Sequence, residues 1–386
     1  MQILAVMIRG IVRFFTEADI VLFVLSVASA IYGLILISSV TGNVGNEVSV
    51  QVGAFIIGIV LFVLFSYIDV DIIADKSKLL FLFSMLFLST LWVWGVGEGV
   101  GAGRGSWLRF GVIGVQPAEV VKVPFIIIMA RIIVSLKERR TFNSFFSIIQ
   151  IAVVFATFVV IILVIARDLG TSVVYFGILA LMLFTAGMKL RWFLIAAVVI
   201  VIATPFVWES DAIFSDLQRD RILAPFIPDV IDPTGTGVLW QPMRSFEAIA
   251  TGGVFGQGLG NGRLAQSVDA MPAHHTDFIF SVAGEELGFM GCMAIIALLI
   301  AIIVRCIFVG IKSNNPLGLL VCVGVASLLF VHMFMNIGMA LAIMPTIGVP
   351  LPFFSYGGSS IVTCFAAMGI VSGIKMRPKP VRFRHL

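Results

Sequence analysis

Charge is what this sequence has least of. Lys, Arg, Asp and Glu make up only 12% of its 386 residues, whereas hydrophobic residues make up 60%, and the mean hydropathy is +1.12. These values exclude an ordinary soluble globular domain and are typical of a polytopic membrane protein. The length allows roughly ten membrane spans of about 20 residues each, together with one sizeable loop.

Cysteine is also scarce, with four residues that all lie inside apolar runs. Buried cysteine behaves as a small hydrophobic residue, and the spacing fits neither a metal site nor a disulfide framework. The sequence pI of about 9.0 does not require a nucleic-acid partner, because Lys and Arg on the inward side of a membrane protein give the same value. We therefore expect a membrane-embedded protein that binds no nucleic acid.

The apolar residues fall into ten segments that are separated by polar turns and are long enough for membrane helices. They cover approximately residues 19–39, 48–68, 79–97, 113–135, 145–166, 170–187, 192–208, 278–309, 316–340 and 356–374. If the amino terminus is cytoplasmic, most Lys and Arg residues lie on the inward side. We predict an all-α polytopic membrane protein with about ten transmembrane helices and both termini cytoplasmic. It forms a single domain over residues 1–386.

A large extracytoplasmic loop, residues 209–277, is predicted between the seventh and eighth helices. Residues 218–223 (QRDRIL) favour an amphipathic helix that places Arg219 and Arg221 near the membrane surface. Residues 241–262 favour a short helix, which carries Arg244, followed by a glycine-rich loop. That loop lacks the G-x-G-x-x-G spacing, so dinucleotide binding is excluded. An earlier outward loop, residues 95–111, is glycine-rich and carries Arg109.

The polar end of the long loop runs directly into an apolar helix within residues 272–291. Asp277 lies at this junction, where a carboxylate is costly unless it is paired or used. We predict that Asp277 is the catalytic carboxylate and that His275 either orients it or packs at the loop edge. Glu285 and Glu286 lie eight and nine residues farther along the helix, too far to form a two-carboxylate pair with Asp277 unless the helix breaks. They are interpreted as supporting ion pairs.

Further polar residues occur within the apolar segments. Glu119 and Lys122 are three residues apart, so they share a helix face. They form a structural ion pair or line a polar cavity with Lys122 available to an anionic headgroup, and the two roles are compatible. Asp168 is interpreted as a helix cap, and His332 and Asn336 as partners in an interhelical hydrogen bond.

Residues 345–360 contain three prolines and three glycines and cannot form a continuous helix. We predict a re-entrant turn on the outward side, packed beneath the long loop, with Ser359 in a structural role.

These motifs, in this order, resemble those of the SEDS family (shape, elongation, division and sporulation), which includes RodA, FtsW and SpoVE. The resemblance covers nearly the whole chain and is carried by QPAEVVK, DLGT, QRDRIL, HTDFIF with GEELG, and PLPFFSYGGSS. QRDRIL and PLPFFSYGGSS are more similar to RodA-type than to FtsW-type members. Arg167 departs from the family pattern, which usually has Pro before Asp168.

The resemblance implies a peptidoglycan glycosyltransferase that joins lipid II units into glycan strands at the outer face of the bacterial cytoplasmic membrane. It implies that Asp277 is the essential acid, that undecaprenyl diphosphate leaves with inversion, and that a class B penicillin-binding protein and the elongation machinery are partners. Asp277 acts as a general base or holds a divalent cation, with no cofactor otherwise expected. The groups predicted to contact substrate are Arg109, Glu119, Lys122, Arg219, Arg221, Arg244 and His275.

Three alternatives remain open at this point. A flippase for the same lipid, a division polymerase of FtsW type, and a scaffold for the transpeptidase all fit the spans and the intramembrane charges.

Overall fold

A computed structural model describes residues 14–41, 46–97, 105–111, 113–210, 215–266, 271 and 274–377. Its long helices, in chain order, are α2 (Ile20–Thr41), α3 (Glu47–Ser66), α5 (Ser77–Ser89), α8 (Lys122–Glu138), α9 (Phe145–Ile161), α10 (Leu169–Thr185), α11 (Leu190–Trp208), α16 (Ile279–Lys312), α17 (Pro316–Ala340) and α18 (Gly358–Met376). The short elements between α3 and α10 are α4 (Val70–Asp75), α6 (Leu91–Trp94), β1 (Leu108–Phe110), β2 (Ile113–Val115), α7 (Pro117–Val120) and the π-helix η1 (Ile162–Ala166).

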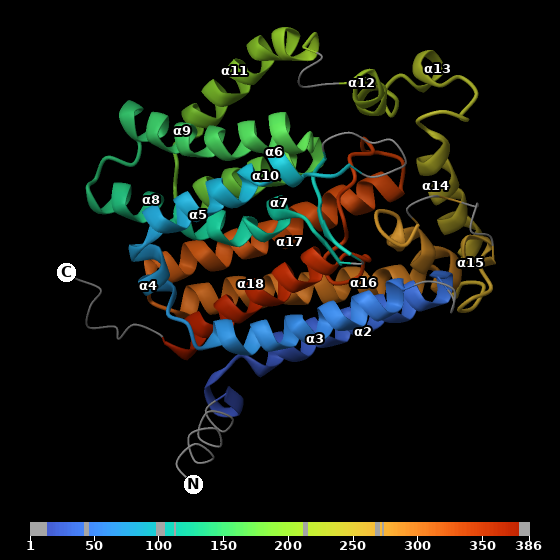
Figure 1. The fold of residues 1–386 in the computed structure, drawn as a ribbon, viewed down its shortest axis with the longest axis horizontal. Helices are drawn as coiled ribbons and strands as arrows, with labels where there is room; N and C mark the ends of the chain where they lie inside the picture. Colours follow the sequence, from blue (N-terminus) through green and yellow to red (C-terminus); the bar gives the residue numbers. More distant parts are fainter. Residues whose placement is uncertain are drawn as a thin grey trace.

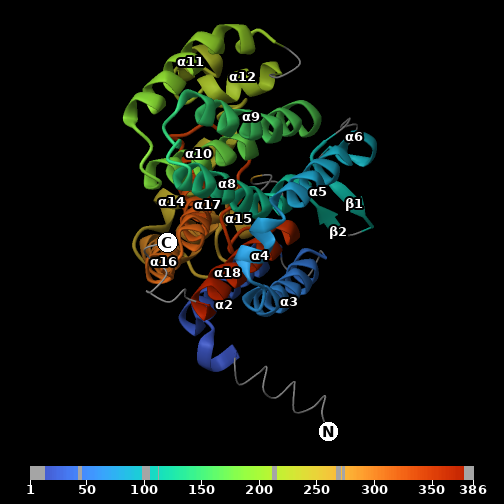
Figure 2. The same ribbon diagram turned by 90° about the vertical axis from the view of Figure 1, so that its left-hand side faces the viewer.

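The long helices form one bundle with α17 and α18 near its centre (Figures 1 and 2). Helix α18 lies along α3, and a Cβ added at Gly369 would lie 2.6 Å from the carbonyl oxygen of Phe62. Small residues at such crossings let two helix backbones approach closely. Helix α11 lies at the edge of the bundle, and none of its described side chains is buried. The core of the bundle therefore lies around α17 and α18.

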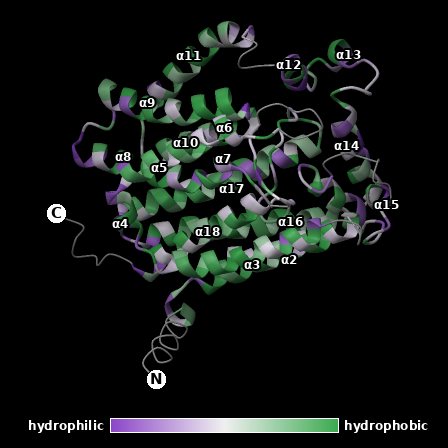
Figure 3. Cartoon of the chain, viewed as in Figure 1, coloured by the Kyte–Doolittle hydropathy of each residue, from purple (hydrophilic) through white to green (hydrophobic). Residues whose placement is uncertain are grey.

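Hydrophobic residues cover the long helices, whereas hydrophilic residues gather at helix ends and on the connecting segments (Figure 3). Seven helical segments within the described residues are long and apolar enough to cross a membrane, and α10 and α11 are shorter apolar helices. The predicted class, an all-α polytopic membrane protein, is confirmed. The exact number of spans stays a prediction.

Four short helices lie between α11 and α16: α12 (Asp216–Leu223), α13 (Pro228–Ile231), α14 (Trp240–Gly252) and α15 (Arg263–Gln266). The predicted helix at QRDRIL is α12, and Ser215 caps it through a capping box with Gln218. The predicted short helix and glycine-rich loop are α14 and residues 253–262. The large loop thus has its own helical structure.

Helix α16 is broken at Gly288, where φ is +67°. The glycine-rich loop fills the break: the N–H of Gln257 donates to the carbonyl of Glu285 (3.0 Å), and the N–H of Phe289 donates to the carbonyl of Gly253 (2.9 Å). A Cβ at Gly288 would lie 2.4 Å from the nitrogen of Gly256. Only glycine fits here, because the position requires both a left-handed backbone and close approach. The loop and the helix form one interlocked unit.

Two predicted helix boundaries were wrong. Residues 113–115 form strand β2, which pairs antiparallel with β1, with Leu108 opposite Val115, rather than the start of a helix. Gln116 is extended (φ −99°, ψ 105°), because the residue before a proline is disfavoured in the α region, and the helical chain begins at Pro117. The third predicted segment ends at Trp94, since Val96 pairs with Trp107 in a β-bridge.

Residues 341–357 are not helical, which confirms the predicted interruption before α18. Side chains of neighbouring helices form hydrogen bonds with backbone carbonyl groups of this irregular segment. His332 contacts the carbonyl of Pro350 (2.9 Å), Asn336 donates to that of Val349 (2.8 Å), and Gln51 donates to that of Ser355 (3.2 Å). Irregular backbone inside a membrane protein requires such partners.

Candidate active site

A cavity of about 810 Å³ lies where several parts of the chain meet. Its walls come from the β1–β2 hairpin, the η1–α10 junction, α12, the turn at residues 274–278, the irregular segment 341–357, α7 and the starts of α3 and α18. The charged or titratable residues that line it, apart from Tyr356, are Glu47, Arg109, Glu119, Arg167, Asp168, Arg221, His275 and Asp277.

Asp277 lies on the turn that precedes α16, and the backbone of this turn is held at three successive residues. The carbonyl of Asp277 accepts a hydrogen bond from Asn336 of α17 (2.7 Å). The carbonyl of Thr276 accepts one from the hydroxyl of Ser355 (2.5 Å), and that of His275 accepts one from the N–H of Tyr356 (2.9 Å). A fixed backbone restricts where the carboxylate can point, as a catalytic group requires.

His275 lines the cavity beside Asp277 and packs against Tyr356, with 5.5 Å between ring centroids. Burial, and to a lesser extent the neighbouring His274, lowers the pKa of His275 below its usual value. The imidazole is therefore neutral at pH 7. This state fits both predicted roles, orientation of Asp277 and packing at the loop edge.

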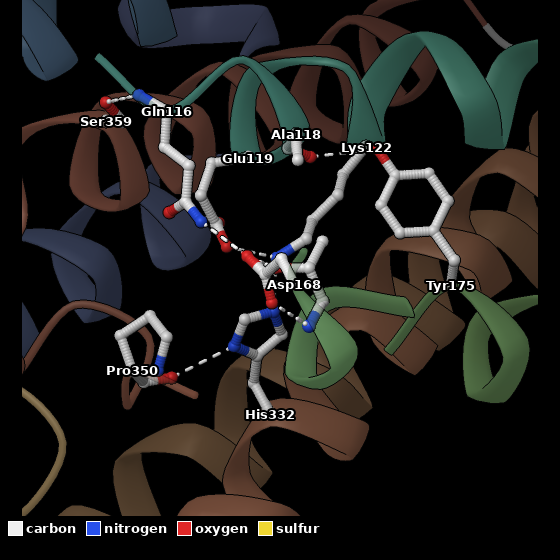
Figure 4. A network of polar contacts seen from close by, with 10 residues as sticks. Gln116, Ala118, Glu119, Lys122, Asp168, Tyr175, His332, Pro350 and Ser359 are labelled. Carbon is white, nitrogen blue, oxygen red and sulfur yellow. Dashed lines mark hydrogen bonds and ion pairs between the residues drawn. The ribbon is translucent and has the colours of Figure 1, made fainter. Parts of the chain in front are cut away.

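The predicted ion pair between Glu119 and Lys122 is present behind the cavity wall (Figure 4). Lys122 is fully buried, and its ammonium group lies between the carboxylate of Glu119 and Nε2 of His332, the latter at 2.8 Å. His332 thus makes the predicted interhelical contact, whereas Asn336 bonds the turn and the irregular segment instead. Glu119 lines the cavity but Lys122 does not, so contact of Lys122 with a headgroup stays a prediction.

Asp168 caps α10, as predicted: its carboxylate accepts from the N–H and the hydroxyl of Thr171, both at 2.8 Å. The same carboxylate accepts from the side chain of Gln116 (2.7 Å). Ser359, at the start of α18, accepts from the N–H of Gln116 (3.0 Å) and donates to the carbonyl of Gly114 (3.2 Å). Asp168 and Ser359 therefore join the hairpin to α10 and α18 and shape the cavity wall (Figure 4).

Three arginines line the cavity, and two predicted substrate contacts lie elsewhere. Arg109 and Arg221 were predicted, and Arg167 joins them. Arg219 pairs with Asp216 (2.8 Å) on the other face of α12, and Arg244 pairs with Glu247 (3.2 Å) on α14. Neither lines the cavity, so their contact with substrate stays a prediction.

Comparison with known proteins identifies the family. A sequence model described as "Cell cycle protein", which covers FtsW, RodA and SpoVE, matches residues 18–379. This chain belongs to that family.

Individual relatives agree with this assignment. The peptidoglycan glycosyltransferase MrdB of Escherichia coli (strain K12) is 29% identical over 94% of both chains. The probable peptidoglycan glycosyltransferase FtsW of Geobacter metallireducens is 36% identical over 71% of this chain and 70% of its own.

Two solved structures share the fold. The rod shape determining protein RodA of Thermus thermophilus has a TM-score of 0.68 at 23% identity. A chain from a peptidoglycan synthase complex has a TM-score of 0.77 at 24% identity. In both cases the match covers 96% of this chain and 99% of the other.

Glu285 and Glu286 have a different role in this family member from the predicted ion pairs. The carboxylate of Glu285 accepts from the N–H groups of Arg263 and Leu264, both at 3.0 Å, and lies 4.0 Å from the Arg263 guanidinium. Glu286 accepts from the N–H of Gly260 (2.9 Å) and the hydroxyl of Ser39 (2.6 Å). Both carboxylates hold the backbone of the long loop, so the ion-pair interpretation was wrong for Glu286 and secondary for Glu285.

A divalent cation on Asp277 is the alternative role predicted for this carboxylate. In the part of the chain that the structure describes, no three His, Cys, Asp or Glu side chains gather in a metal-binding arrangement. A cation held by Asp277 together with substrate oxygens stays a prediction, and we derive no step through a cation.

Sequence analysis missed several lining residues of the cavity. Arg167 appeared only as a departure from the family pattern, Gln116 only as part of a motif, and Glu47 and Tyr356 had no assigned role. Their signal was weak because each lies at or near a helix end, where polar and aromatic side chains are common in membrane proteins without a functional role. Only the folded chain brings them together.

Proposed function

We propose that this member of the FtsW, RodA and SpoVE family polymerises lipid II into glycan strands at the outer face of the bacterial cytoplasmic membrane. The observation that carries the proposal is that Asp277, Arg109, Arg167 and Arg221 all line the same cavity. The curated relatives named above are peptidoglycan glycosyltransferases, and this chain is an enzyme of that class.

The reaction joins an acceptor sugar hydroxyl to an anomeric carbon that carries a polyprenyl diphosphate. The hydroxyl oxygen attacks the anomeric carbon, and its proton passes to the carboxylate of Asp277, which acts as general base. The bond between the anomeric carbon and the phosphate oxygen breaks, and its electron pair leaves with the diphosphate. A single displacement of this kind inverts the anomeric centre and needs no covalent intermediate.

The leaving diphosphate gains negative charge in the transition state, so fixed cations near it lower the barrier. Arg109 and Arg221, the two predicted arginines that line the cavity, supply that charge. Lys122, whose ammonium group also contacts His332, acts from behind the wall by holding the Glu119 carboxylate in place. Arg219 and Arg244 remain candidates for headgroups that approach over the long loop.

We assign the chain to cell elongation rather than to division. The fold match to the rod shape determining protein RodA extends over 96% of this chain, and the sequence match to MrdB runs over 94%. A class B penicillin-binding protein is the proposed partner, because a structural neighbour comes from a peptidoglycan synthase complex. The proposed topology has both termini in the cytoplasm and residues 209–277 outside.

Polymerisation by purified protein tests the proposal. The wild type, with its transpeptidase partner, is expected to convert lipid II to glycan strands, and Asp277→Ala to lower the rate by at least 10²-fold, the usual range for a general base. Asp75→Ala is a matched control, because Asp75 is an exposed carboxylate on α4 that pairs with Arg131. Polymer formation at the wild-type rate by Asp277→Ala would contradict the mechanism.

A flippase for the same lipid is the rival hypothesis. It predicts lipid movement across liposome membranes that survives Asp277→Ala, without strand synthesis by the wild type. Running both assays on the same preparation separates polymerisation from transport.

A further inference from the structure

Arg167 occupies an unusual backbone position at the η1–α10 junction. Its φ of +52° and ψ of +37° are left-handed, a conformation that costs a non-glycine residue about 1 kcal/mol or more. Its side chain is exposed and lines the cavity. The fold therefore holds an arginine at a position where glycine or asparagine would be less strained.

The wall that carries Arg167 adjoins the wall that carries Asp277. A Cβ at Gly170, three residues after Arg167, would lie 2.2 Å from the carbonyl oxygen of Ile347, so α10 packs directly on the irregular segment. A Cβ at the next residue, Gly348, would lie 3.4 Å from Oδ2 of Asp277. The side chains of Arg167 and Asp277 therefore line the same cavity.

Arg221 reaches the same space from α12. The side chain of Gln218 donates to the carbonyl of Arg167 at 3.5 Å, which fixes α12 against the η1–α10 junction. Residues three apart on a helix lie on the same face, so Arg221 faces the junction as Gln218 does. Two guanidinium groups from separate elements thus line one side of the cavity.

These two cations are not neutralised by nearby acids. Among the described residues, no carboxylate lies within 4.0 Å of the guanidinium of Arg167 or Arg221, although Arg219, Arg244 and Arg305 each have such a partner. The neighbouring carboxylate of Asp168 is engaged by Thr171 and Gln116. A pair of guanidinium groups in this state suits a phosphate ligand, because each can donate two parallel hydrogen bonds.

We propose that Arg167, together with Arg221, binds the diphosphate of a lipid-linked sugar, as a substrate-binding residue additional to those predicted from the sequence. The inference rests on the proposed function for the identity of the substrate. The ligand chemistry, a diphosphate ester, is shared by the glycosyl donor and the acceptor.

Direct binding tests this site without catalysis. Polyprenyl diphosphate, polyprenyl monophosphate and polyprenol are titrated onto the full-length protein in phosphatidylcholine nanodiscs. Arg167→Asn removes the charge while tolerating the left-handed backbone, and Arg167→Lys keeps the charge. We expect Arg167→Asn to weaken diphosphate binding roughly 10-fold or more, as loss of a charged hydrogen bond implies. Arg167→Lys should weaken it less, and polyprenol binding should not change.

Arg139→Gln is the matched control, since Arg139 is an exposed arginine at the far end of α8 and outside the cavity. It should bind polyprenyl diphosphate as the wild type does. Equal diphosphate affinities of the wild type and Arg167→Asn, with Arg221→Gln also unchanged, would overturn the inference. If diphosphate binds through these arginines but lipid II is never polymerised, the site stands and the proposed function fails.

Steady-state polymerisation then distinguishes the two sources of the diphosphate. If Arg167 holds the leaving group, Arg167→Asn lowers kcat with little change in KM. If it holds the acceptor, KM for lipid II rises instead. Unchanged kcat and KM would overturn a role for Arg167 in the reaction.

Discussion

Lys122 is a fully buried cation whose ammonium group contacts Glu119 and His332. Removing one partner of a buried ion pair leaves the other charge unpaired in a low dielectric, which typically costs about 3–5 kcal/mol. We expect Lys122→Met to lower the midpoint of thermal unfolding in detergent markedly and to reduce polymerisation with it.

The double variant Glu119→Gln/Lys122→Met tests the cause. Because it removes both charges, it should recover much of the stability lost by Lys122→Met. If Lys122→Met were as stable as the wild type, the ion pair between Lys122 and Glu119 would contribute nothing to stability. The proposal that Lys122 holds Glu119 in the cavity wall would then be wrong.

Asp232 provides a pH-sensitive contact in the long loop. Its carboxylate accepts from the N–H groups of Leu239 (3.0 Å) and Gly237 (2.9 Å), and these bonds hold the pKa of Asp232 below its usual value. A carboxyl with a lowered folded pKa stabilises the turn above the unfolded pKa of about 3.9, and this contribution is lost as the pH falls through the folded value. Hydrogen-exchange protection of Gly237 and Leu239 should decline on acidification.

Asp232→Asn separates this titration from general acid effects. It cannot ionise, so the protection of the two amides should be lower at neutral pH and should vary less between neutral and acidic conditions. Identical pH profiles for the wild type and the variant would exclude Asp232 as the titrating group.

At the scale of elements, the broken helix α16 and the glycine-rich loop depend on each other. Gly288→Ala combines a left-handed φ with a Cβ that would lie 2.4 Å from the nitrogen of Gly256 and 2.6 Å from the carbonyl of Val254. Gly253→Ala is the matched control, because φ is +56° but nothing lies within 4 Å of its Cβ. We expect Gly253→Ala to cost about 1 kcal/mol and Gly288→Ala at least twice that.

Thermal unfolding of both variants measures the difference. Gly288→Ala should also lower polymerisation, because the helical segment 279–287 that follows Asp277 is oriented by the break. Equal stability of the two variants would show that the close approach is easily relieved and that the loop does not fix the helix.

Sequence patterns predicted those elements whose cause is local. The apolar runs predicted the helices, Asp168 was assigned as a cap from its place between two runs, and three prolines predicted the interruption before α18. The hairpin formed by β1 and β2 was missed because β2 is apolar and lies directly before the helical chain that begins at Pro117. Periodicity cannot separate a short apolar strand from the start of a helix.

At the scale of the whole molecule, the sequence predicted the members of the site better than their assembly. Asp277, His275, Glu119, Arg109 and Arg221 all line the cavity, yet nothing local distinguishes Arg221 from Arg219, two residues earlier on α12. Their different directions depend on how α12 packs on the η1–α10 junction. Glu286 shows the same limit, because its partners Gly260 and Ser39 come from a distant loop and helix.

The orientation of the whole molecule in the membrane is testable through its cysteines, since all four native thiols are buried. A single cysteine introduced at an exposed position therefore reports its own side against a low background. Asp229→Cys lies in the long loop, and Arg139→Cys lies between α8 and α9. With both termini cytoplasmic, a membrane-impermeant maleimide should label Asp229→Cys in intact cells and Arg139→Cys only after permeabilisation.

This labelling pattern also decides where the chemistry can occur. The cavity is lined by Gln218 and Arg221 of α12, so the proposed function requires a sugar headgroup to enter from the side on which the long loop lies. Labelling of Asp229→Cys only after permeabilisation would place Asp277 at the cytoplasmic face. Strand synthesis at the outer surface would then be impossible without a prior transport step. This result would contradict the proposed polymerase topology and favour the flippase hypothesis.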